Sequence, residues 1–397
     1  MIQNKRGRVQ LENYVASAIS CLDRLVAFET ISALPNLDII SYVQEQLQRE
    51  GVKSIISYDE TGKRANLHAF IGPRVDGGVV LNGHTDVVPV EGQEWMSDPF
   101  SLHQEDGRLY GRGAVDMKGF LACMIAAVPM WQQKALQKPI HICMCFDEET
   151  GGFGAPILVK DMCEKAPNPA IAIIGEPTEM QIVTAHKAGY EMRTEITGLE
   201  AHSSGPERGV NAIHFGVRFI SYLLDMAEEL AAQPDEDSRF EPNYTTINVG
   251  TIEGGVARNT VAGTCGFDWE IRPLPSMDGK ALIARITDYA MNTLLPQMRK
   301  THPEAEIHIE MQADVPGLGH SQAERATRLV SDITGINSTH AVPFGTDAGH
   351  FAAAGISTIV MGPGSIEQAH KPDEYIEISQ IRACLEFFDK LGNHLAK

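Results

Sequence analysis

Imidazole and carboxylate side chains follow several apolar runs of this sequence, at the points where predicted strands end. The apolar runs are residues 78–82, 140–146, 170–175 and 358–361. The side chains that follow them, or lie on loops beyond them, are His84, Asp86, Asp116, Glu148, Glu149, Glu176 and His370. In open α/β sheets, ligands bind at the carboxyl ends of the strands. Because imidazole nitrogens and carboxylate oxygens are typical donors to catalytic metals, the pattern predicts a two-metal hydrolase centre.

The pair formed by His84 and Asp86 is a candidate for one ligand and its support. Asp86 lies two residues after His84, which is too close for an ideal second ligand from the same strand end. Its expected role is to accept the free ring N–H of His84 and so fix the tautomer. The alternative is a turn histidine followed by an Asx turn, because short His/Asp patterns are common.

The carboxylates of the other loops also have two readings. Asp116 is either the N-cap of the helix that follows or a bridge between two metals, and nearby glycines permit a crowded turn. Glu148 and Glu149 repel each other unless cations are present, so one is expected to bind metal while the other faces the water. A solvated acidic loop is the alternative there, and an exposed turn is the alternative for Glu176 and His370.

The elements that position these residues alternate between strand and helix as far as residue 176, which indicates a sheet with helices on both faces. After residue 184 the order becomes βαββαβ, the ferredoxin-like arrangement, and after residue 316 the first alternation resumes. We therefore expect an α/β catalytic domain with a central mixed sheet flanked by helices, at residues 1–182 and 316–397, and an inserted ferredoxin-like domain at residues 183–315, with dimerisation or lid function.

Composition excludes several classes of protein. The 397 residues carry a formal net charge of -19, which argues against general binding to nucleic acids or anionic membranes. The seven cysteines form no CxxC pair, which favours a reduced, cytoplasmic compartment. No apolar run is expected to approach the roughly 18 residues that span a bilayer.

Four motifs surround the candidate residues: Gly-His-Thr-Asp at 83–86, Gly-Arg-Gly-x-x-Asp-Met-Lys-Gly at 111–119, Glu-Glu-Thr-Gly-Gly at 148–152 and Gly-Glu-Pro-Thr at 175–178. With these motifs the chain resembles, from about residue 80 to 380, the zinc metallopeptidase family that includes acetylornithine deacetylase, succinyl-diaminopimelate desuccinylase, aminoacylase and glutamate carboxypeptidase. Residues 95–100 and 362–375 look most similar to the deacetylase members.

The resemblance implies a role for each site residue. One Zn²⁺ would be held by His84, Asp116 and Glu176, and a second by Asp116, Glu149 and His370, with Co²⁺ able to substitute. Glu148 would be the general acid and base, Asp86 would orient His84, and the Asp116–Met117 peptide bond would be cis.

The resemblance also implies roles for residues of the inserted domain. His202 would reach the active site of a neighbouring subunit, which implies a homodimer, and Asn259 and Arg272 would bind the substrate carboxylate. The alternatives are a turn residue for His202 and an ion pair with Asp268 or Glu270 for Arg272.

Together these features predict a cytoplasmic, zinc-dependent N-acyl-amino-acid deacetylase of arginine biosynthesis. The expected substrate is N2-acetyl-L-ornithine, and neither nucleic acid nor membrane is expected as a partner. A desuccinylase, another deacylase or a carboxypeptidase would share the same metal ligands. A non-catalytic amino-acid-binding protein is a further alternative, against which the presence of Glu148 argues, because metal binding alone does not need that carboxylate.

Overall fold

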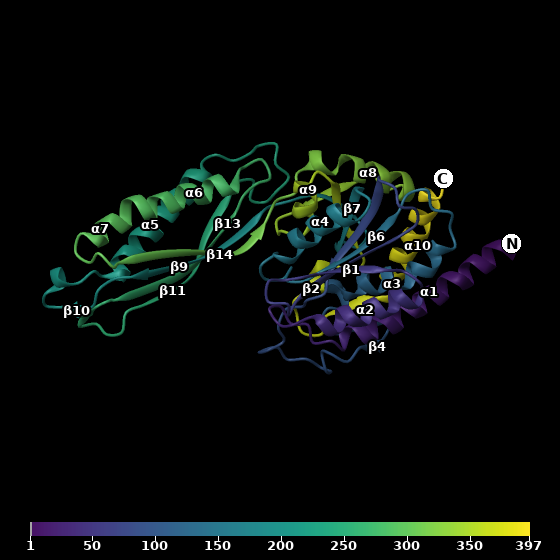
Figure 1. The fold of residues 1–397 in the computed structure, drawn as a ribbon, viewed down its shortest axis with the longest axis horizontal. Coiled ribbons are helices and arrows are strands. Elements are labelled where there is room, and N and C mark those ends of the chain that lie inside the picture. The colour runs from purple at the N-terminus through teal and green to yellow at the C-terminus, as the bar shows by residue number, and fades with distance from the viewer. Residues whose placement is uncertain (1) are drawn as a thin grey trace. The chain divides into compact units, whose positions relative to one another are not determined.

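The chain folds into two compact units in a computed structural model that describes residues 2–397, with side chains from Val9 onward (Figure 1). Unit 1 comprises the chain up to Ala185 together with Leu318–Ala341 and Thr346–Lys397, and unit 2 comprises His186–Gly317 and Val342–Gly345. Both boundaries of the predicted inserted domain, 183 and 315, therefore lie within three residues of the boundaries of the main segment of unit 2. The short segment 342–345 was assigned to the catalytic domain from sequence, but it packs with unit 2.

Unit 1 is built on a mixed eight-stranded sheet, as the sequence predicted for the α/β class. In spatial order its strands are β1 (Ser54–Tyr58), β2 (Ala65–Ile71), β6 (Ile140–Cys145), β3 (Gly78–His84), β7 (Pro169–Pro177), β16 (Ser357–Gly362), β8 (Ile182–His186) and β15 (Thr339–Val342). The central strands β6, β3, β7 and β16 are parallel to one another. Every residue of β3 and β6 is buried, as expected of parallel strands covered on both faces.

Helices cover both faces of this sheet. One layer packs around α3 and against β16, and it contains α1 (Ile2–Val26), α2 (Leu37–Arg49), α3 (Gly119–Gln132), α8 (His320–Thr334) and α10 (Ile378–Leu395). The other layer contains α4 (Gly154–Lys165) and α9 (Ala348–Ala353). A small antiparallel sheet joins β17 (Tyr375–Glu377), β5 (Arg108–Tyr110) and β4 (His103–Glu105).

The segment Ala114–Gln132 corrects one expectation from the sequence. Its 19 residues are long and apolar enough to cross a membrane by length and composition. However, 94% of the apolar window is buried inside unit 1, where α3 contacts α1 and α10. The apolar character of this segment is therefore that of a core helix covered on all sides.

Unit 2 contains a four-stranded antiparallel sheet in the order β11 (Thr246–Gly254), β13 (Thr264–Arg272), β9 (Gly189–Thr197) and β14 (Glu306–Val315). Its helices are α5 (Ala212–Ala231), α6 (Gly279–Tyr289) and α7 (Leu295–Arg299), with the π-turn η3 (Ala290–Leu294) between the last two. One apolar core joins these helices to the sheet. The chain order and strand order match the predicted ferredoxin-like βαββαβ arrangement.

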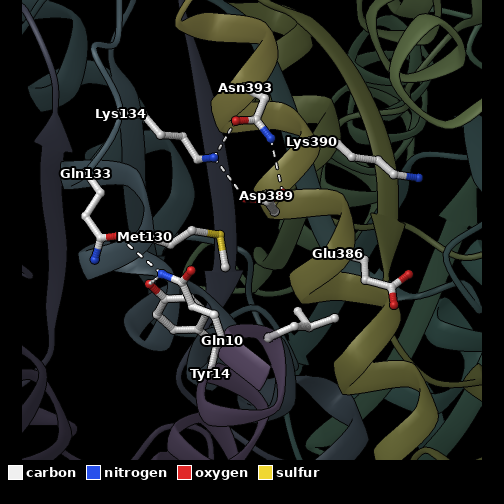
Figure 2. Close-up of a pocket in the computed structure, with 10 residues that line it drawn as sticks. Gln10, Tyr14, Met130, Gln133, Lys134, Glu386, Asp389, Lys390 and Asn393 are labelled. Carbon is white, nitrogen blue, oxygen red and sulfur yellow. Dashed lines mark hydrogen bonds and ion pairs between the residues drawn. The ribbon is translucent and has the colours of Figure 1, made fainter. Parts of the chain in front are cut away.

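A cavity of about 570 Å³ in unit 1 lies among α1, α3 and α10 (Figure 2). Its polar groups largely satisfy one another. Lys134 Nζ donates to Asp389 at 2.8 Å and to Asn393 at 2.6 Å, and Gln10 donates to Tyr14 and to Gln133, both at 3.3 Å. The residues that line it include none of the site residues predicted from the sequence. This cavity is therefore separate from the edge of the sheet at which those residues gather.

Candidate metal centre

The predicted metal ligands all belong to unit 1 and come from different loops and strand ends. His84 is the last residue of β3, Glu148 and Glu149 follow β6, and Glu176 lies near the end of β7. Asp116 lies in the irregular turn η1 (Ala114–Lys118), and His370 follows the short helix η4 (Ile366–Gln368). Because β3, β6 and β7 are parallel, their carboxyl ends bring these side chains to one edge of the sheet.

The turn that carries Asp116 depends on a glycine, and the Asp116 side chain does not cap the helix that follows. Gly113 has φ of +79°, and a Cβ there would lie 2.6 Å from Val87 Cγ1. The N-cap position of α3 is Lys118, and no side chain caps that helix. The alternative reading of Asp116 as an N-cap is therefore wrong, and its carboxylate is available to the site. The Asp116–Met117 peptide bond is cis, as the resemblance implied.

Asp116 lies between two imidazoles. Its Oδ1 is 3.1 Å from His84 Nε2, and its Oδ2 is 3.2 Å from His370 Nε2. Around His84, Glu176 Oε1 lies at 3.8 Å and Glu148 Oε2 at 3.9 Å from Nε2. On the other side, Glu149 Oε2 is 3.0 Å from His370 Nε2. The structure thus brings together all five predicted ligands and Glu148.

Two overlapping sets of ligand atoms are close enough to share an ion. His84, Asp116 and Glu149 offer three atoms within 4.8 Å of one another, and His84 also belongs to a second set of three with Glu148 and Glu176. The adjacent side chains of Glu148 and Glu149 turn to different imidazoles, as expected for a pair with two roles. The structure therefore separates the pair into a carboxylate beside His84 and a carboxylate beside His370.

The electrostatics of the cluster fit a bound cation. Burial and the charge of Glu176 raise the pKa of Glu148 well above 4.5, and burial and the charge of Asp116 raise the pKa of Glu149 to about 7. Hydrogen bonds to Asp116 and Glu149 raise the pKa of His370 to about 10. Glu176 Oε1 is buried without a hydrogen-bond partner among the described residues. A divalent metal ion would offset the repulsion among these buried carboxylates and would be coordinated by the free oxygen of Glu176.

The main chain and the carboxylate of Asp86 make separate contacts in the cluster. The Nδ1 of His84 lies 2.9 Å from the main-chain carbonyl oxygen of Asp86, whereas Asp86 Oδ1 is 3.6 Å away. The carboxylate instead accepts the backbone N–H groups of Glu148 at 3.3 Å and Glu149 at 3.2 Å, and the hydroxyl of Ser32 at 2.7 Å. The carbonyl of Asp86 therefore orients His84, and its carboxylate anchors the backbone of the two glutamates.

Three predicted site residues belong to unit 2. His202, in β10 (Ala201–His202), pairs with Thr260 of β12 (Thr260–Val261), and its Nδ1 lies 2.7 Å from the hydroxyl of Ser204. Asn259 is close by, because its carbonyl accepts the backbone N–H of Ser203 at 3.0 Å. The structure thus brings His202 and Asn259 onto adjoining segments.

Arg272 makes one of the two ion pairs that the sequence allows, the one with Glu270. Its Nη2 and Nε lie 2.7 Å and 3.1 Å from Glu270 Oε2. The other candidate partner, Asp268, instead accepts a hydrogen bond from Arg193 at 3.2 Å. Arg272 Nη1 takes part in neither of the contacts with Glu270. The structure therefore contains the ion pair with Glu270, and Nη1 of the guanidinium lies outside it.

Sequence reasoning missed a buried ion pair beside the cluster. Arg112 Nη1 donates to Glu374 Oε2 at 2.7 Å, and each side chain is 1% exposed. Both residues lie in segments that resemble the family, 111–119 and 362–375, but the sequence does not predict their pairing. Buried opposite charges 262 positions apart leave no periodic signal in a single sequence.

A family model and two curated relatives match most of this chain. The family model described as Peptidase family M20/M25/M40 matches residues 80–394. Acetylornithine deacetylase of Pasteurella multocida (strain Pm70) is 34% identical over 390 residues, which are 95% of this chain and 97% of the relative. Acetylornithine deacetylase of Shigella sonnei (strain Ss046) is 34% identical over 391 residues, which are 97% and 99% of the two chains.

The fold is also similar to solved structures. The M20 family metallo-carboxypeptidase Sso-CP2 from Sulfolobus solfataricus superposes with a TM-score of 0.72 at 19% identity, over 96% of this chain and 99% of that one. At this identity the likeness concerns the fold alone.

Proposed function

Because this chain belongs to peptidase family M20/M25/M40, we propose that it is a zinc-dependent amidohydrolase that removes the acetyl group from N2-acetyl-L-ornithine. The family and the deacetylase relatives support a metal-dependent hydrolase that acts on amides. The observation that carries the proposal is the position of the Asp116 carboxylate, whose oxygens lie 3.1 Å and 3.2 Å from the two imidazoles. A carboxylate between two imidazoles suits a pair of catalytic metal ions.

Each residue of the cluster has a chemical task in this proposal. His84, Asp116 and Glu176 would hold one ion, and Asp116, Glu149 and His370 would hold the other. Bound metal ions polarise an amide carbonyl and make water a nucleophile near neutral pH.

Proton transfer is then the task of Glu148. Its carboxylate would take the proton of the attacking water and deliver it to the leaving amine. Asp86 would keep Glu148 and Glu149 in place through their backbone N–H groups. His202 would donate a hydrogen bond to the oxyanion that develops on the substrate.

The acyl group and the amino acid are the parts of the proposal that the ligand set leaves open. A desuccinylase or a carboxypeptidase of this family would use the same metal ligands. The deacetylase relatives, each matched over more than nine-tenths of its length, favour acetylornithine over these alternatives.

A substrate comparison tests this choice. We expect kcat/KM for N2-acetyl-L-ornithine to exceed the values for acetyl-citrulline, acetyl-glutamate and succinyl-diaminopimelate by at least about tenfold, or roughly 1.4 kcal/mol in transition-state free energy. Steady-state hydrolysis with zinc present, and again after chelation, measures both selectivity and metal dependence. A higher value for the succinyl substrate would assign the chain to desuccinylation. Amino-acid binding without any turnover would indicate a binding protein.

A second experiment concerns recognition of the substrate carboxylate by Arg272. We expect Arg272→Lys to lower kcat/KM by about 10–150-fold, the equivalent of roughly 1.5–3 kcal/mol for a hydrogen bond to a charged group, because lysine lacks the planar fork. The metal content should not change. Glu270→Gln removes the internal ion pair and serves as the matched control.

The form of the substrate then separates the two readings of Arg272. When the α-amide of acetylornithine replaces the α-carboxylate substrate, kcat/KM of the wild type should fall by a similar factor. The kcat/KM of Arg272→Lys should fall little further, because its carboxylate contact is already weakened. If kcat/KM falls equally in both proteins with the amide, or if Glu270→Gln lowers kcat/KM as much as Arg272→Lys does, then Arg272 does not bind the substrate carboxylate and only forms the ion pair with Glu270.

A further inference from the structure

The buried ion pair of Arg112 and Glu374 connects three loops that border the metal cluster. Besides Glu374, the guanidinium of Arg112 donates to Gln93 Oε1 at 2.5 Å and, at 3.4 Å each, to the carbonyls of Pro89 and Lys371. The ring of Trp95 lies 5.0 Å from its guanidinium carbon. A buried ion pair is costly to desolvate and is often no more stabilising than apolar packing. Its donors and acceptors are therefore better explained by what they hold in place.

One arm of this arrangement holds the backbone of Asp116. Glu374 Oε1 accepts the backbone N–H groups of Val115 at 2.9 Å and Asp116 at 3.2 Å. The carbonyl of Glu374 also accepts the backbone N–H of Gly111 at 2.9 Å. The carboxylate that faces both imidazoles is thus fixed from behind by the carboxyl group of Glu374, which Arg112 orients.

The other arm holds His370 through Gln93. The side-chain N–H of Gln93 donates to the carbonyl of His370 at 2.9 Å, while its Oε1 accepts from Arg112 and from the Trp95 indole at 3.1 Å. Support is needed here because the His370 side chain is 52% exposed and its φ is +63°, a conformation that non-glycine residues rarely adopt. Arg112 holds the next carbonyl as well, that of Lys371.

We propose that Arg112 and Gln93 form a positioning relay that sets metal affinity at the position formed by His370, Glu149 and Asp116. Neither side chain contacts a ligand atom, because Gln93 contacts the main-chain carbonyl of His370 and Arg112 contacts Glu374. Glu374 acts on both metal positions, because Asp116 is shared by both. The inference rests on the proposed function in one respect, namely that the cluster binds two metal ions.

The variant Gln93→Glu tests the relay with a small change. A carboxylate at this position still accepts from Arg112 and Trp95 but has no N–H to donate to the carbonyl of His370. We expect one of two zinc dissociation constants to rise about 10–100-fold, as is typical when a residue that supports a ligand is lost, and the other to change less than about threefold. The added negative charge would by itself lower the dissociation constant for a cation. A rise in that constant therefore reports the loss of the N–H donor.

The measurement is a titration of the metal-free full-length protein with Zn²⁺ against a chromophoric chelator, and it does not depend on turnover. Glu94→Gln is the matched control, because Glu94 is an exposed neighbour that makes no hydrogen bond or ion pair with any described residue. Both of its constants should equal those of the wild type. Glu374→Gln should raise both constants, and the melting temperature of metal-free Gln93→Glu should equal that of the wild type.

The outcomes separate this inference from the proposed function. Unchanged constants in Gln93→Glu, or equal rises in both, would overturn the relay while leaving the hydrolase intact. A wild-type protein that binds two zinc ions but hydrolyses none of the acyl amino acids would overturn the function, and the relay would still be tested by the titration. A wild-type protein that binds fewer than two ions would overturn both.

Discussion

Replacing Glu148 by glutamine should lower kcat by about 10²–10⁴-fold while the protein keeps its metal, since this is the usual contribution of a positioned general acid–base group. Glutamine has nearly the same shape but cannot accept the proton of the attacking water. Glu148 Oε2 lies 3.9 Å from His84 Nε2, so its carboxylate borders the ion that His84, Asp116 and Glu176 would hold. Because all three of those ligands remain in the variant, its loss should affect proton transfer more than metal retention.

The adjacent residue provides the matched comparison. Glu149 Oε2 lies 3.0 Å from His370 Nε2, so Glu149→Gln should lose one of the two metal ions as well as turnover. Metal content by elemental analysis and single-turnover kinetics on each variant distinguish the two effects. If Glu148→Gln kept near-wild-type kcat, or if it lost metal and Glu149→Gln did not, the roles of the two glutamates would be reversed.

Mixing two inactive variants should restore activity if His202 acts across a dimer interface. Random exchange of His202→Ala and Glu148→Gln subunits makes half of the dimers mixed, and each mixed dimer contains one intact composite site. The expected recovery is about a quarter of the wild-type activity. If His202 served its own subunit, no site in the mixture would be complete and activity would stay at the level of the separate variants.

Features of unit 2 support the dimer as a proposal. Strand β11 is an edge of the four-stranded sheet, and its residues from Gly250 to Gly254 are exposed. On α5, which packs against β11, Val217 is 50% and Leu224 is 53% exposed. An open strand edge beside apolar side chains suits pairing with a second copy. Sedimentation of the wild type provides the control, because a fully active monomer would rule out the composite site.

The sequence by itself determined the central strands and the residues at their ends. Residues 78–82, 140–146 and 171–175 are apolar runs that are fully buried in a covered parallel sheet, and this places His84, Glu148 and Glu176 at its carboxyl edge. The change to βαββαβ order likewise predicted the sheet of unit 2. These features depend on side-chain periodicity and on neighbours in the chain, so a single sequence carries them.

Other features were decided by contacts between distant segments. The carboxylate of Asp86 accepts hydrogen bonds from Ser32, 54 positions earlier, and from the backbone N–H of Glu148, 62 positions later. Asp268 pairs with Arg193, which lies 75 positions earlier on the neighbouring strand β9. The apolar segment 114–132 became a core helix because α1 and α10 cover it.

The pairing of Arg112 with Glu374 shows the physical reason most clearly. A buried charge needs a partner, but its partner can come from any loop that the fold brings to the same place. Here the two residues are 262 positions apart, and they meet only because the turn after β5 and the loop before β17 lie together. The amino-acid pattern thus specified the ligands and the strands that carry them, whereas the packing of the whole sheet edge specified the groups that hold those ligands in place.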